Sequence, residues 1–125
     1  LSGTFYTIDR LPEGWQFAHR VGEDGSLSDR RLFARVAAVD PTSGISAYPD
    51  GLKVDSAGNV YIGQYSMGRI VVVTPEGELL KAIEVPSATA PNLTFNADES
   101  KLFVMAVDDT DHAPYMGKVY EVPSQ

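Results

Sequence analysis

The chain has 125 residues, the length of a single domain, and its 43% hydrophobic and 22% charged content predicts an ordered globular protein. It contains no cysteine, which excludes disulfide bonds, thiolate metal sites and a cysteine nucleophile. The formal net charge of −7 argues against nucleic acid and anionic membrane surfaces as partners, because both would repel most of the protein surface.

The beginning of the sequence, "LSGTFYTIDR", has no positively charged region followed by an apolar one, so no signal peptide is predicted. The longest apolar runs, such as residues 70–73, are too short to cross a bilayer. We therefore expect a soluble protein, and the sequence leaves its compartment open.

Short stretches rich in β-branched and aromatic residues recur along the chain, each bounded by turn residues. In chain order, the expected strands are "GTFYTID" (3–9), "WQFAHRV" (15–21), "RRLFARV" (30–36), two strands within 50–62, "RIVVVTP" (69–75), "LLKAIEV" (79–85), two strands within 92–104 and "GKVYEVP" (117–123). No convincing helical pattern interrupts them, so the chain is predicted to be all-β.

The expected strands form a repeat. Val60 corresponds to Leu102, 42 residues later, and the same offset makes Asn92 the counterpart of Asp50. Four antiparallel strands that recur about every 40 to 45 residues are typical of a β-propeller blade. The alternative is a β-sandwich of short hairpins. We predict a single all-β domain over 1–125, a partial β-propeller with roughly two full four-stranded blades plus most of a third.

The predicted blades are an incomplete one at about 1–40 and two more at about 48–86 and 90–123. A propeller closes into a ring of about four to eight blades, and a partial ring leaves flat apolar faces exposed. We therefore expect either self-association, as a homodimer or a higher oligomer, or completion by a missing N-terminal half.

Asp50 lies between Pro49 and Gly51, where an apolar strand begins. A carboxylate in that place is costly unless it has a partner. One interpretation is a turn carboxylate that accepts hydrogen bonds from backbone amides. The other is a ligand of a metal ion.

The stretch "YPDGLKVDSAGNVYIGQYSMGRIVVVTPEGELL" resembles the SMP-30/gluconolactonase/lactonase-like family of six-bladed propellers. The resemblance is carried by Pro-Asp-Gly at 49–51 and by Asp-x-x-Gly-Asn at 55–59. It extends over nearly all of the chain, which would correspond to the C-terminal part of such a propeller. The resemblance implies hydrolysis of a lactone or ester.

In that family the metal is held by one Glu, two Asn and the Asp of the Pro-Asp-Gly motif. Only the last is present here, as Asp50, which the resemblance makes both a metal ligand and a catalytic proton acceptor. The implied ion is divalent, Ca²⁺ before others, which takes about six to eight oxygen ligands. Asn92 is a candidate substrate-binding residue, or alternatively a turn amide. The alternative to an enzyme is a non-catalytic half-propeller that acts in binding or assembly.

Other polar residues are assigned structural roles. Asp55 and Asp98 are expected to stabilise hairpin turns, because aspartate bonds its own backbone in turns. "DDTDH" at 108–112 lacks the spacing of a calcium-binding loop and is expected to form a solvated connection between strands. The two histidines, His19 and His112, are not expected to form a catalytic triad.

Overall fold

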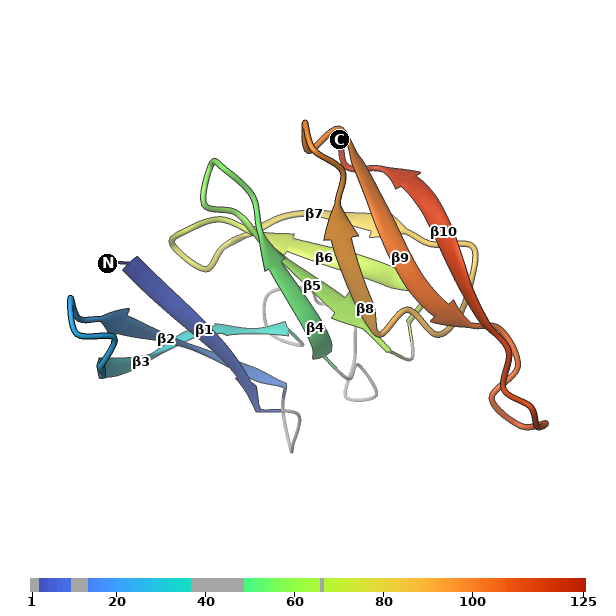
Figure 1. The fold of residues 1–125 in the computed structure, drawn as a ribbon, viewed down its shortest axis with the longest axis horizontal. Helices are drawn as coiled ribbons and strands as arrows, with labels where there is room; N and C mark the ends of the chain where they lie inside the picture. Colours follow the sequence, from blue (N-terminus) through green and yellow to red (C-terminus); the bar gives the residue numbers. More distant parts are fainter. Residues whose placement is uncertain (1–2, 10–13, 37–48, 66) are drawn as a thin grey trace.

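The computed structural model describes residues 3–9, 14–36, 49–65 and 67–125. These residues form ten strands in three antiparallel sheets (Figure 1). The strands are β1 (Gly3–Asp9), β2 (Trp15–Val21), β3 (Leu27–Arg35), β4 (Pro49–Val54), β5 (Val60–Gln64), β6 (Arg69–Val73), β7 (Leu79–Glu84), β8 (Asn92–Phe95), β9 (Lys101–Val107) and β10 (Gly117–Pro123). The prediction of an all-β partial propeller is confirmed. Over the same residues, no helix has the length and apolar character needed to cross a membrane.

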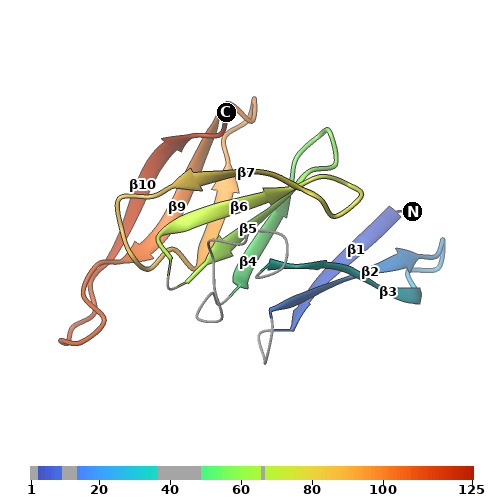
Figure 2. The same cartoon turned by 180° about the vertical axis from the view of Figure 1, so that it is seen from behind.

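The first sheet has the order β1-β2-β3, the second β4-β5-β6-β7 and the third β8-β9-β10. Each sheet is a meander in which every strand pairs with the next one along the chain (Figures 1 and 2). Four strands were expected in the third sheet as in the second, but the described residues supply three.

The central strands β5 and β6 of the second sheet are buried on both faces, and this explains their nearly continuous apolar sequences. On one face, Ile62 and Val71 pack with Tyr6 and Phe33 of the first sheet. On the other face, Tyr61 contributes to a larger cluster shared with the third sheet. Alternate residues of one strand therefore serve two different cores, as the side-chain period of a strand requires.

The larger cluster joins the second and third sheets. Its fully buried members include Ile70 from β6 and Leu93 and Leu102 from the third sheet. The Tyr61 and Phe95 rings meet edge to face, with centroids 4.9 Å apart. The core of the molecule therefore lies between sheets, as it does between the blades of a propeller.

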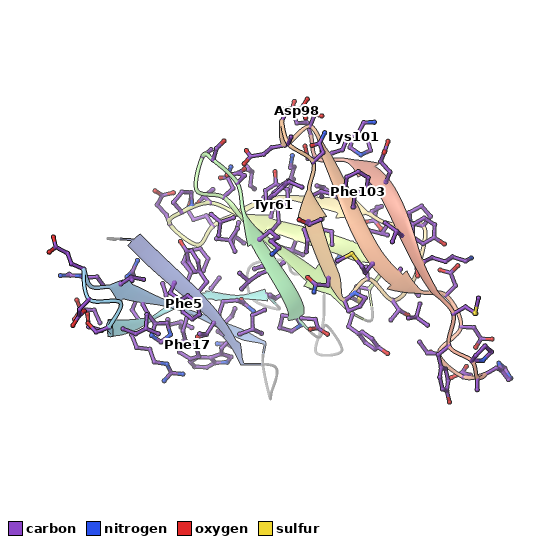
Figure 3. All side chains as sticks on the ribbon, in the orientation of Figure 1. Phe5, Phe17, Tyr61, Asp98, Lys101 and Phe103 are labelled. Carbon is purple, nitrogen blue, oxygen red and sulfur yellow. The ribbon has the colours of Figure 1, made fainter. Side chains whose placement is uncertain are left out.

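The outer faces of the two terminal sheets carry exposed apolar side chains. Phe5 is 48% exposed on the first sheet, and Val119 is 64% exposed on the third. Phe17 lies near Phe5 and is covered by the guanidinium of Arg30, 3.7 Å from the ring centroid (Figure 3). His19, also on the first sheet, forms a hydrogen bond with Thr7, with 3.0 Å between Nε2 and Oγ1.

Candidate functional site

Asp50 lies at the beginning of β4 and is half-buried. The pairing of Pro49 with Gln64 places the end of β5 beside it, and β8 begins next to β4 (Figure 1). We call this edge, formed by residues 49–51, 64–65, 67–69 and 91–92, the Asp50 end. It contains the two residues to which the sequence assigns a function, Asp50 and Asn92.

The strand β4 has an irregularity at Asp50. Pro49 pairs with Gln64 and Leu52 pairs with Ile62, so Asp50 and Gly51 together lie opposite the single residue Gly63. Two residues opposite one is the arrangement of a β-bulge, which re-aims side chains and recurs beside functional sites. The acidic residue of the Pro-Asp-Gly motif is therefore part of a local departure from regular pairing.

The bulge is in direct contact with the third sheet. The Gly51 N–H donates a hydrogen bond to the carbonyl oxygen of Pro91, with an N···O distance of 2.6 Å. A Cβ atom on Gly51 would lie 2.2 Å from Oδ1 and 2.9 Å from Cα of Asn92, so only glycine fits. A Cβ on Gly63 would likewise lie 2.8 Å from the carbonyl oxygen of Ala90.

Asn92 corresponds to the two-residue bulge formed by Asp50 and Gly51, so the repeat prediction holds for Asp50 and Gly51 shares the position. Asn92 pairs with Met105 alone, whereas the equivalent Gly63 faces both Asp50 and Gly51. Between the bulge and the turn, Val54 corresponds to Phe95, an offset of 95 − 54 = 41 residues, because the hairpin of the third sheet is one residue longer. It closes between residues 96 and 101, where the hairpin of the second sheet closes between 55 and 59. Asn92 therefore corresponds to the bulge as a whole, and the residue in contact with it is Gly51.

The side chain of Asn92 is exposed and partly engaged. Its Oδ1 accepts a hydrogen bond from the N–H of Leu93 at 2.9 Å, a local contact of the kind expected for a turn amide. Asp50 and Asn92 thus begin adjacent strands, with Gly51 between them. The structure therefore places both predicted site residues at the Asp50 end, with Gly51 in contact with Asn92.

A buried polar pair also lies at this end, and sequence reasoning missed it. Gln64 is fully buried and Arg69 is 7% exposed. The Nε–H of Arg69 donates to Oε1 of Gln64 at 2.6 Å. The two residues face each other across the β5–β6 connection. In the sequence, Gln64 ends one apolar strand and Arg69 begins the next. Polar residues are also expected at strand ends exposed to solvent, so this pattern does not indicate burial.

The segment 108–116 connects β9 and β10, as predicted for "DDTDH". Its acidic residues do not converge. Asp109 accepts hydrogen bonds from the backbone of Asp111 and from the backbone and ring of His112, and these bonds lower its pKa. Lys118 and then Tyr120 hold the pKa of Asp108 below its usual range by donating to the carboxylate.

No metal-binding cluster is present in the part of the chain that the structure describes: no three His, Cys, Asp or Glu side chains gather in a way that could hold an ion. The donor set expected for calcium is therefore not met by this chain's described residues. Of the metal ligands implied by the resemblance, the chain supplies Asp50, a single carboxylate at the beginning of β4. The two histidines lie apart from each other: His19 on β2 contacts the hydroxyl of Thr7, and His112 in the β9–β10 connection contacts Asp109.

The opposite edge of the sheets confirms the turn assignments. Asp55 accepts a hydrogen bond from the N–H of Asn59 at 2.8 Å, and Asp98 accepts one from the N–H of Ser100 at 3.0 Å (Figure 3). Sequence reasoning missed Glu99, whose carboxylate reaches across to the second sheet and accepts from both the N–H and the hydroxyl of Ser56. These hairpins border a polar groove of about 430 Å³.

The sequence and fold have relatives among known proteins. Residues 2–108 match the family described as "SMP-30/Gluconolactonase/LRE-like region". A 6-deoxy-6-sulfogluconolactonase from Pseudomonas putida is 28% identical over 83 residues, which are 66% of this chain and 27% of that protein.

Solved structures of several proteins share the fold. A gluconolactonase from Xanthomonas campestris superposes with a TM-score of 0.66 and 30% identity, covering 82% of this chain and 31% of that one. A structure described as a calcium-binding protein, regucalcin from Agrobacterium tumefaciens, gives a TM-score of 0.66 at 20% identity, covering 93% of this chain and 44% of the other. The chain thus spans less than half the length of each of these relatives.

Proposed function

Because the chain belongs to the SMP-30/gluconolactonase/LRE-like family, we propose that it is part of a metal-dependent lactone or ester hydrolase whose ring is completed by further blades. The observation that carries the proposal is the place of Asp50. It lies in a bulge, half-buried, at the edge where two neighbouring sheets begin. The gluconolactonase and sulfogluconolactonase relatives support a lactone as the substrate class.

In this proposal Asp50 has two roles. It supplies one carboxylate ligand to a divalent cation, with Ca²⁺ as the first candidate, and it accepts a proton from the attacking water. Asn92 would bind the substrate through its carboxamide at the start of the neighbouring strand. The other oxygen ligands would come from the segment that completes the ring.

A non-catalytic half-propeller is the second candidate function. It is favoured by one observation, that the described residues supply no cluster of metal-binding side chains besides the lone Asp50. Such a chain would keep the scaffold and act through its exposed sheet faces.

Calcium titration of the purified chain by calorimetry separates these candidates. If self-association of the chain completes the site, binding should fall within the range of protein calcium sites, about 10⁻⁷ to 10⁻³ M, with Asp50 as one charged ligand among several. The Asp50→Ala variant should lose it. Asp111→Ala removes the same charge from an exposed connection and is the matched control, which should bind as the wild type does. If the wild-type chain binds no calcium, the metal site is refuted for this chain and the non-catalytic function is favoured.

Completion of the ring by a second copy is the proposed mode of assembly. The described residues form three sheets, and the outer faces of the first and third are apolar. Their charges also differ. Residues 3–9 and 14–36, which hold the first sheet, contain four Arg and four acidic residues, whereas residues 92–125 contain six acidic residues and two Lys. We propose that the first sheet of one copy packs on the third sheet of the other, which a two-fold axis would repeat to give six sheets.

Light scattering coupled to size exclusion tests this arrangement. Val119→Lys places a charge on the outer face of the third sheet and should raise the dimer dissociation constant by about tenfold or more, since burying a valine contributes about 1.5 kcal/mol or more. Leu80→Lys, on the outer strand β7 at a similarly exposed site, should leave the dimer intact. A wild-type chain that stays monomeric at millimolar concentration would contradict self-association.

A further inference from the structure

The contact between the β4 bulge and the third sheet has properties that packing of two apolar faces does not require. It is a hydrogen bond between backbone groups. On the β4 side it is made by Gly51, the residue directly after Asp50. In a regular antiparallel pair, the Gly51 N–H would lie in the plane of its own sheet and point either toward β5 or away from it. Here the extra residue of the bulge lets that N–H bond to Pro91 of the neighbouring sheet instead.

Two glycines make room for this contact. Gly51 has no space for a side chain against Asn92, and Gly63, opposite the bulge, has none against the carbonyl oxygens of Ala90 and Pro91. Both glycines therefore approach one segment, residues 90–92. The segment is itself anchored, because Ala90 and Leu93 are fully buried in the cluster between the two sheets.

We propose that residues 90–92 are a positioning element for Asp50: the Gly51–Pro91 hydrogen bond and the close contact of Gly51 with Asn92 fix the bulge that carries the carboxylate. The importance of that carboxylate rests on the proposed function, but the positioning itself does not depend on a metal. Gly51 of the Pro-Asp-Gly motif then has a structural role. Because it lacks a side chain, the third sheet can approach closely enough for Pro91 to accept a hydrogen bond from its N–H. Asn92 is assigned a positioning role in addition to its candidate contact with substrate.

The test is amide hydrogen exchange of the full chain by NMR, without calcium. In the wild type, the Gly51 amide should be protected, because its hydrogen bond lies at a junction of two sheets. In Gly51→Ala the added Cβ must push Asn92 away. We expect the residue-51 amide to exchange about tenfold to hundredfold faster, as overpacking of this size implies. The backbone shifts of Asp50 should move with it.

A rescue variant separates positioning from a general loss of stability. Gly51→Ala with Asn92→Gly removes the two atoms nearest the new Cβ, at 2.2 and 2.6 Å, and should restore part of the protection and the Asp50 shifts. Gly117→Ala on β10, where the nearest atom is 3.9 Å away, is the matched control and should leave residue 51 unchanged. The amides of β5 and β6 report the stability of the whole chain.

Two results would overturn the inference. One is a wild-type Gly51 amide that exchanges as fast as an unprotected peptide. The other is a Gly51→Ala variant in which the amides of residue 51 and of β5 accelerate by the same factor, with no rescue by Asn92→Gly. Neither result depends on calcium binding. If calorimetry shows that the wild-type chain binds no calcium, or that Asp50→Ala binds it equally well, that result counts against the proposed function and not against this inference.

Discussion

Replacing Gln64 with leucine is expected to lower the free energy of unfolding by about 3 kcal/mol, because it removes an acceptor from a buried guanidinium. Gln64 is fully buried and accepts from Nε of Arg69, which is 7% exposed. Leucine has a similar volume, so the cavity contribution is small and the loss comes from the charged donor left without this partner. Urea unfolding followed by circular dichroism measures the change.

The double variant Gln64→Leu with Arg69→Leu is the matched control for this prediction. It removes the donor together with the acceptor, and replacing both partners of a buried pair with apolar groups is close to neutral in other proteins. The double variant should therefore be more stable than the sum of the single changes predicts, by about 1 kcal/mol or more. Additive single effects would mean that the Gln64–Arg69 contact contributes nothing of its own.

Replacing Leu102 with alanine is expected to lower the free energy of unfolding by about 3 to 4 kcal/mol. Leu102 is fully buried in the cluster between the second and third sheets, and truncation leaves a cavity that flanking strands cannot fill. Thermal and urea unfolding of the variant measure the loss.

Leu80→Ala makes the same chemical change at a site that is 52% exposed, and it should cost less than about 1 kcal/mol. A loss at Leu102 no greater than at Leu80 would mean that the second and third sheets are not packed together as described.

Strand positions were predictable because a strand has a side-chain period of two and ends at turn residues. Residues 3–9, 15–21 and 117–123 were expected as strands and form β1, β2 and β10 with the same bounds. The exact register was not predictable. One extra residue lies in the hairpin closed by Asn96 and Lys101, and one lies in the β4 bulge, so Asn92 corresponds to both Asp50 and Gly51.

The candidate site was predictable only where a motif carries it. Asp50 stood out because a carboxylate between Pro49 and Gly51 is unusual at a strand entrance. The Gln64–Arg69 pair gave no such signal, because burial of a polar side chain depends on which sheets pack against it. The contact of Glu99 with Ser56 was equally hidden, since it joins residues 43 positions apart in different sheets.

The second and third sheets are joined at both of their ends. At one end the Gly51 N–H bonds to Pro91, and at the other the carboxylate of Glu99 holds Ser56. Between these two contacts lies the larger apolar cluster, whereas the first and second sheets share a smaller one. Local unfolding follows the line of fewest buried contacts. The seven strands from Pro49 onward should therefore open and close as one cooperative unit, with the first sheet as the part that detaches first.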